Sequence, residues 1–262
     1  MANASKATYV YCVIAAPRAP RLTRVPAGLP GAGRVRLLDL DRGLHLVVAD
    51  VPLTRYGEAA IQRGLSDLDW VSRVAVAHEA VIESFIHTTA VLPMKLFTIF
   101  NSDERALAHV RADRPRIDAL VKRLANHHEW GIRVVLDRTR AIKAARPRRT
   151  TAAAPSGAAY LSRKKAQRDV SIELTERSRD VVDALYDRLA SRSRLARRRV
   201  ASELPGQASP AGSLLLDGAF LVRRSRSKAF RAFAEREART LSRSGYGLTL
   251  SGPWPPYSFV QE

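Results

Sequence analysis

The residues best suited to metal or acid–base chemistry are the histidines and the carboxylates next to them. His78 and Glu79 lie on an expected helix, but Ile82 stands where a zinc-binding His-Glu-x-x-His motif requires its second histidine. His87 follows His78 by nine residues, a spacing that does not bring the two side chains together on one helical face. We therefore interpret His78 as a polar contact at the edge between a helix and a sheet, and we expect no metal site.

Other chemically suggestive residues are explained by ordinary structural roles. Asp67 and Asp69 match the Asp-x-Asp pattern of metal-dependent glycosyltransferases, but they also precede an apolar helix as capping residues do. We interpret His127-His128-Glu129 as a charged cluster at the C-terminal end of a helix. Cys12, the single cysteine, lies inside an apolar strand, where a buried and inert thiol is expected.

Motifs for nucleotide binding and for nucleophilic catalysis are lacking. The segment Gly28–Gly33 has the spacing GxxGxG, contains a proline and is followed by no helical pattern, so it is not a dinucleotide-binding loop. The sequence contains neither a Walker loop nor G-x-S-x-G. We expect a non-catalytic protein with no cofactor and no bound metal.

Charge is the one unusual property of the composition. The 44 Lys and Arg exceed the 25 Asp and Glu by 19, which favours acidic partners, nucleic acid among them. Between Arg140 and Arg199 stand 17 basic and 6 acidic residues with only two aromatic ones, Tyr160 and Tyr186, so a solvated basic face explains this segment better than a nucleic-acid surface. No apolar run reaches the length of a membrane span and no signal peptide is recognisable, so we expect a cytoplasmic protein.

Apolar periodicity predicts an α+β domain at residues 1–139. Three strands are expected at Tyr9–Ile14, Arg34–Leu40 and Leu44–Val51, the last two joined by a tight turn. The apolar stripe of residues 70–85 predicts a helix. A second helix opens with a capping box at Asn101–Glu104, and Pro115 is expected to kink or split it. With extended segments at 91–100 and 129–136, this order predicts a mixed or antiparallel sheet with helices on one face.

The second half predicts another α+β domain, at residues 158–262, after a basic linker at 140–157. Its expected elements alternate along the chain: helices at 160–169 and 172–195, a loop at 204–213, a strand at 214–222, a helix at 230–241 and a strand at 246–250. The closing segment Ser251–Val260 contains three prolines and the aromatic residues Trp254, Tyr257 and Phe259. This tail either folds back to close the core of the second domain or is displayed as a ligand for a partner.

Short segments along nearly the whole chain together resemble the gas vesicle protein F/L family. They are Tyr9–Tyr11, Leu29–Gly31, Leu68–Trp70, Ala77–Val81, Val91–Met94, Glu129–Gly131, Tyr160–Arg163 and Gly252–Phe259. The terminal Pro-Trp-Pro-Pro-Tyr-Ser-Phe is the most specific of them. One departure lies at Lys95–Thr98, where relatives usually have Arg-Phe-Gly-Thr: Phe97 replaces the glycine and crowds any backbone approach there.

The resemblance implies a ferredoxin-like N-terminal domain, a smaller α+β C-terminal domain with a helical insertion, and no catalytic residues, metal or cofactor. It further implies a role in gas vesicle formation, as an accessory or minor component that binds the main shell protein and other accessory proteins. From the expected sheet edge and the charge, we hypothesise binding by strand addition with charge attraction. The expected interface residues are Tyr11, Trp70, Pro93, Trp254 and Tyr257. The alternative function is that of a basic nucleic-acid-binding protein.

Overall fold

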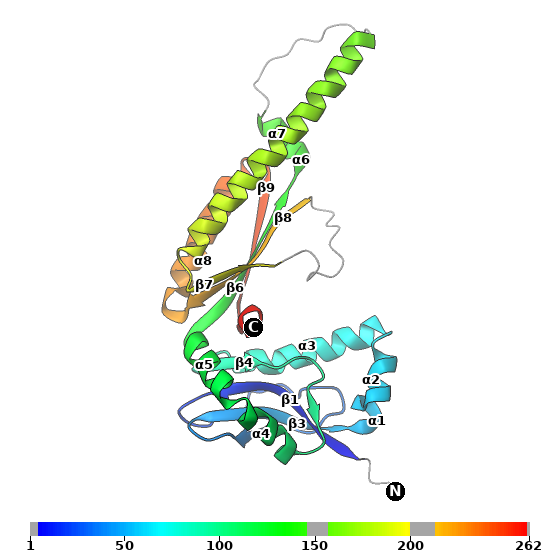
Figure 1. The fold of residues 1–262 in the computed structure, drawn as a ribbon, viewed down its shortest axis with the longest axis vertical. Helices are drawn as coiled ribbons and strands as arrows, with labels where there is room; N and C mark the ends of the chain where they lie inside the picture. Colours follow the sequence, from blue (N-terminus) through cyan, green and yellow to red (C-terminus); the bar gives the residue numbers. More distant parts are fainter. Residues whose placement is uncertain (1–4, 146–156, 200–212, 261–262) are drawn as a thin grey trace. The chain divides into compact units, whose positions relative to one another are not determined.

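The computed structural model describes residues 5–145, 157–199 and 213–260 (Figure 1). The chain forms two compact units, Met1–Glu129 with Trp254–Glu262, and Trp130–Pro253. These differ from the expected domains 1–139 and 158–262, because strand β6 (His127–Leu136) runs into the second unit and the residues after Pro253 belong to the first. Of the expected linker, residues 140–145 lie in helix α6 (Arg138–Ala145) and residues 146–156 lie outside the described residues.

Strand β1 is the centre of the first sheet, which has the order β2-β3-β1-β4 with β5 also paired to β1. The pairings of this sheet are antiparallel, and an irregularity in β1 falls between Val10 and Cys12. The bounds are β1 (Lys6–Ala15), β2 (Arg36–Asp39), β3 (Leu44–Pro52), β4 (Ala90–Pro93) and β5 (Ile99–Phe100). The predicted turn between β2 and β3 is confirmed, with positive φ at Asp41, Arg42 and Gly43.

Helices cover both faces of this sheet, and not only the one face expected from the sequence (Figure 1). Tyr9 of β1 packs into a core shared with α3, whereas its neighbour Thr8 hydrogen-bonds Asp103 at the start of α4. Neighbouring residues of a strand point to opposite faces, so α3 and α4 lie on different sides. All of β1 except Lys6 is buried, as a strand covered on both faces must be. The helices are α1 (Leu53–Tyr56), α2 (Glu58–Gly64), α3 (Leu68–Ser84), α4 (Asp103–Ala112) and α5 (Arg114–Leu124).

The helix boundaries of the first unit follow the predicted signals. Asp67 caps α3 by accepting hydrogen bonds from the backbone N–H groups of Asp69 and Trp70, both at 3.0 Å. Ser102 caps α4 through the backbone N–H of Arg105. Pro115 lies in the first turn of α5, where its missing N–H is tolerated, and it separates α5 from α4 as predicted.

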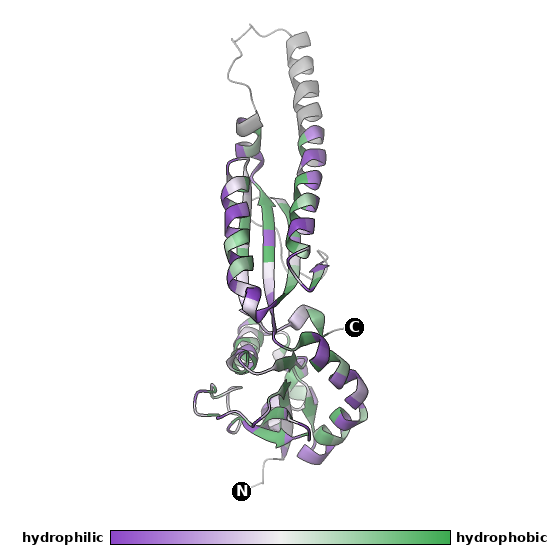
Figure 2. Cartoon of the chain, turned by 90° about the vertical axis from the view of Figure 1, so that its left-hand side faces the viewer, coloured by the Kyte–Doolittle hydropathy of each residue, from purple (hydrophilic) through white to green (hydrophobic). Residues whose placement is uncertain are grey.

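The second unit contains a four-stranded sheet of order β7-β8-β6-β9 with helices α7 and α8 packed on it. The elements are α7 (Gly157–Ala190), β7 (Leu195–Arg198), β8 (Ser213–Arg223), α8 (Ser227–Ser242) and β9 (Tyr246–Trp254). Hydrophilic and hydrophobic residues alternate in bands along α8 and along the coloured C-terminal part of α7 (Figure 2). Two predictions are corrected: one helix replaces the two expected at 160–195, and it ends at Ala190 because Leu195 pairs with Leu221 in the sheet. Residues 204–212 of the expected loop lie outside the described residues.

The predicted α+β class, with two antiparallel sheets, is confirmed. Both sheets bury an apolar core against helices, which is the usual way that such layers are stabilised. Within the described ranges, no helix is both long enough and apolar enough to cross a membrane.

Candidate interaction site

Tyr11 and Trp70, from the expected interface, pack in or against the core of the first unit, as does Tyr257, which is described below. Tyr11 is fully buried, and its hydroxyl accepts a hydrogen bond from the backbone N–H of Leu29 at 3.1 Å. Trp70 is half-buried against the same core and stacks on Phe97, with ring centroids 5.6 Å apart and planes 8° from parallel. This packing accounts for both side chains without a partner.

Phe97 keeps a backbone conformation in which glycine is favoured. Its φ is +64°, and a side chain in this left-handed region costs about 1–2 kcal/mol. Its N–H lies 3.3 Å from the hydroxyl oxygen of Tyr9, and its ring rests on Trp70. The phenylalanine noted as a departure from the family therefore fits the loop, because the stacked ring offsets part of the backbone strain.

His78 belongs to a buried chain of hydrogen bonds, which confirms its expected role as a polar contact between helix and sheet. Its Nε2 lies 3.2 Å from the carbonyl of Met94, which can only accept, so Nε2 carries the proton and Nδ1 accepts from the Tyr9 hydroxyl at 2.8 Å. Burial lowers the pKa of His78 to about 4 and raises the pKa of Tyr9. Both nitrogens of this neutral imidazole are thus engaged within the protein.

An apolar groove of about 520 Å³ lies beside the edge strand β4. We name it the β4 groove. One wall comes from β1, β4 and the loop after β4, the other from α4 and α5, and the tail contributes two residues. Its lining residues are Val13, Leu92, Pro93, Met94, Lys95, Thr98, His109, Val110, Asp113, Arg116, Ile117, Leu120, Tyr257 and Val260. Two expected interface residues, Pro93 and Tyr257, are therefore brought together here.

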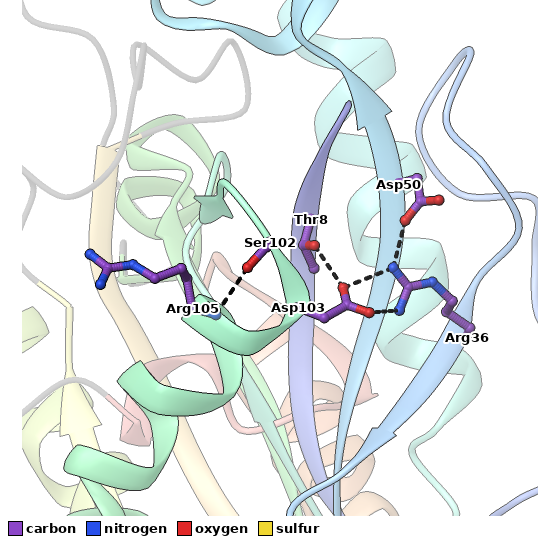
Figure 3. A network of polar contacts seen from close by, with 6 residues as sticks. All are labelled: Thr8, Arg36, Asp50, Ser102, Asp103 and Arg105. Atoms are coloured by element: carbon purple, nitrogen blue, oxygen red, sulfur yellow. Dashed lines mark hydrogen bonds and ion pairs between the residues drawn. The ribbon is translucent and has the colours of Figure 1, made fainter. Parts of the chain in front are cut away.

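A network of charged groups fixes α4, one wall of the groove, to the sheet (Figure 3). Arg36 of β2 holds the Asp103 carboxylate with both Nη atoms, at 2.7 and 2.9 Å, and its Nη2 also binds Asp50 of β3. The Thr8 hydroxyl of β1 donates to Asp103 at 2.7 Å. The hydrogen bonds from Arg36 lower the pKa of Asp103, so the carboxylate stays ionised at the N-terminal end of α4, where the helix dipole also favours it.

The tail is held in the first unit by a buried carboxylate. Glu129 accepts hydrogen bonds from the backbone N–H and from the hydroxyl of Ser258, both at 2.7 Å. Arg123 donates to the carbonyl of Phe259 at 2.8 Å. Tyr257 packs against the core with its hydroxyl buried and without a hydrogen-bond partner in the described structure, and burial raises its pKa. The phenol of Tyr257 thus brings a buried, unsatisfied hydroxyl to the groove wall.

These contacts correct two interpretations of the sequence. Trp254–Val260 belong to the first unit, so the tail does not close the core of the second domain; Phe259 is buried, whereas Trp254 is 38% exposed. His127–Glu129 begin strand β6 and are no helix C-terminus. No local pattern indicates that Glu129 holds the tail, because its partner lies 129 residues further along the chain.

The positive charge lies almost entirely in the second unit. Residues 130–253 contain 27 Lys and Arg against 11 Asp and Glu, a net charge of +16, which leaves +3 for the first unit. Within the described ranges, no three His, Cys, Asp or Glu side chains are grouped as metal ligands would be. The β4 groove is a concave, mainly apolar surface of the first unit, with Lys95, Asp113 and Arg116 in its lining.

Comparison with known proteins identifies the family. The model of the family described as "Gas vesicle synthesis protein GvpL/GvpF" matches residues 7–261. The chain belongs to this family. It is 30% identical, over 244 residues, to a protein named gas vesicle protein L from Streptomyces sp. (strain CB03234), covering 90% of this chain and 87% of that protein.

Solved structures of the family share the fold. The crystal structure of GvpF from Anabaena sp. PCC7120 matches with a TM-score of 0.69 at 15% identity, covering 98% of this chain and 97% of that one. GvpF from Microcystis aeruginosa matches with a TM-score of 0.67 at 14% identity, covering 98% and 99%. The family resemblance drawn from short segments is thereby confirmed.

Proposed function

We propose that this protein is a non-catalytic gas vesicle assembly protein or minor component, and that it binds the main shell protein through the β4 groove. Membership of the GvpL/GvpF family supports a role connected with gas vesicles. The proposal that the groove binds the partner rests on the lining of the groove. This lining combines aliphatic side chains from β4, α4 and α5 with two residues already expected at an interface, Pro93 and Tyr257. The protein acts, in this proposal, at gas vesicles in the cytoplasm, together with other accessory proteins.

The chemistry of the groove suits an apolar segment. A gas-enclosing shell needs subunits with a strongly apolar face, and such subunits associate wrongly unless that face is covered before assembly. Burial of an apolar side chain contributes about 1.5–3 kcal/mol, so a few side chains seated in the groove give useful and reversible affinity. Lys95 in its lining favours an acidic residue beside that apolar segment, whereas Arg116 is already paired with Asp113 at 2.9 Å.

In this proposal, burial of the partner's side chains contributes more to the binding free energy than strand addition does. Strand β4 is an edge strand, as strand addition requires, but it has only four residues and ends at Pro93, which has no N–H to donate. Charge attraction toward the first unit is also small, because its net charge is +3. The hypothesis drawn from the sequence is therefore narrowed to an apolar contact at the groove.

The test substitutes Leu120→Glu in the full-length protein and measures retention of purified shell protein on the immobilised variant. Leu120 is half-buried in α5 and lines the groove, so a carboxylate there should reduce retention about tenfold or more. Val76→Glu is the matched control, because Val76 is 62% exposed on α3 and does not line the groove. Equal retention by Leu120→Glu and the unaltered protein contradicts the proposal. Binding of duplex DNA with a steep salt dependence, and no retention of shell protein, favours the nucleic-acid alternative.

A further inference from the structure

The second sheet contains a buried carboxylate in an otherwise apolar strand. Only 1% of the side chain of Asp217, on β8, is exposed, although the strand is apolar on both sides of it. Leu216 and Phe220 of the same strand pack into the core beneath α7 and α8. Because side chains alternate along a strand, Asp217 points to the face of the sheet away from those helices.

Two arginines, one from β6 and one directly after β7, hold this carboxylate. Arg133 places Nε and Nη2 at 3.2 and 2.9 Å from Oδ2 of Asp217, and Arg199 places Nε and Nη2 at 2.6 and 2.5 Å from Oδ1. The two guanidinium groups flank a single negative charge and leave a net charge of +1. Their side chains are 42% and 29% exposed, so both remain accessible.

The surrounding surface is shaped for polar contacts. A Cβ on Gly131 would lie 2.5 Å from Oγ of Ser251 and 3.5 Å from Nη2 of Arg199, so Gly131 lets the Ser251 hydroxyl and the Arg199 guanidinium come close to the backbone of β6. Ser251 and Thr249 of β9 are exposed and share this face, because Leu248 and Leu250 point to the helical core. Guanidinium and hydroxyl donors therefore gather around one buried anion.

Stability alone does not account for this arrangement. Buried ion pairs are frequently no more stabilising than apolar residues of similar size, because both charges lose their hydration. What Asp217 supplies is orientation: it fixes two guanidinium forks, which both remain partly exposed to solvent. Preorganised forks of this kind bind carboxylates and phosphates with little loss of side-chain entropy.

We propose that Arg133 and Arg199 form a binding site for the carboxylates of a strongly acidic protein segment, independent of the β4 groove. The net charge of +16 on the second unit attracts such a segment over long range. Single-stranded nucleic acid is the poorer fit, because it is bound on exposed aromatic rings. In the part of the second unit that the structure describes, the only large apolar side chain with substantial exposure is Leu195.

The test measures binding of a fluorescein-labelled octaglutamate peptide to the full-length protein by anisotropy. Arg133→Gln should weaken binding about tenfold, the effect of one charge-assisted hydrogen bond. Arg239→Gln is the matched control, because it removes the same charge from an exposed position on α8 and should change affinity less than twofold. Asp217→Asn distinguishes a preorganised site from long-range charge attraction. The substitution raises the net positive charge of the protein, yet it should weaken peptide binding because the two arginines lose the carboxylate that orients them.

Arg133→Lys keeps the charge and the fold but loses the planar guanidinium group. This variant therefore tests the proposed site even if Asp217→Asn unfolds. A loss of about threefold or more with this variant supports the site. Equal affinities for Arg133→Gln and Arg239→Gln, or tighter binding by Asp217→Asn, overturn it. Duplex DNA that binds more tightly than the peptide and depends on Arg133 overturns the assignment to an acidic protein.

Discussion

The two units of this chain share an architecture but differ sharply in their charged residues. Each packs helices on an antiparallel sheet, yet the first has a net charge of +3 and the second +16. All six histidines lie in the first unit and none lies in the second. The charge of +19 is thus a property of one unit, and it says little about what the other unit binds.

The polar groups of the two units also have different structural roles. In the first, Tyr9 and His78 satisfy each other inside the core and the open concave surface is apolar. In the second, guanidinium groups lie on the surface over aromatic rings, with Arg192 at 3.8 Å from the centre of Phe233 and Arg198 at 4.4 Å from that of Tyr186. This contrast supports the two proposals above, an apolar partner for the first unit and an acidic segment for the second.

The substitution with the largest expected effect tests whether each unit is stabilised by its own core. Phe220→Ala empties a fully buried position of the second core and should cost about 4 kcal/mol. Hydrogen exchange should then accelerate at the amides of β6 and β8, while those of β1 keep their protection. Phe233→Ala, at a half-buried position of the same unit, serves as the milder control. Equal acceleration in β1 contradicts the division into two units.

Acid should weaken the first unit through His78. Because burial lowers its pKa to about 4, the unfolded chain takes up a proton first as the pH falls. The contribution of neutral His78 to the free energy of unfolding is fully present above pH 6.5. It is lost toward pH 4, by about 3 kcal/mol at most. Urea unfolding of the unaltered protein and of His78→Gln at pH 7, 6 and 5 measures this, since the difference between the two isolates His78. A constant difference across this range contradicts the neutral, buried imidazole.

Weakening the contact that holds the tail should lower the free energy of unfolding by less than protonation of His78 does. Glu129→Gln keeps an oxygen for the backbone N–H of Ser258 and can donate its amide N–H to the Ser258 hydroxyl, but both hydrogen bonds lose the carboxylate charge, at a cost of about 2 kcal/mol in total. Carboxypeptidase digestion should then remove the residues after Pro256 faster than in the unaltered protein. Glu58→Gln, at an exposed position of α2, should leave the rate unchanged. If Glu129→Gln is digested no faster, another contact holds the tail.

Local signals explain how much could be predicted from the sequence. The β2–β3 turn, the Asp67 cap and the break at Pro115 depend on neighbouring residues, so periodicity and capping rules locate them. The candidate sites depend on pairs that are distant in sequence. Nothing near Glu129 indicates Ser258, and nothing near Asp217 indicates Arg133, because these partners are set by strand order and by the return of the tail.

The smallest effect concerns the loop beside the groove, where Phe97 occupies a left-handed conformation. Phe97→Ala loses the stack on Trp70 and keeps the backbone strain, whereas Phe97→Gly loses the stack but relieves the strain. The glycine variant should therefore be more stable than the alanine variant by about 1 kcal/mol, the reverse of the usual order in helices and strands. Urea unfolding of both variants measures the difference. Greater stability of the alanine variant would show that the loop relaxes to negative φ, and that the stack on Trp70 alone holds Phe97 in its observed conformation.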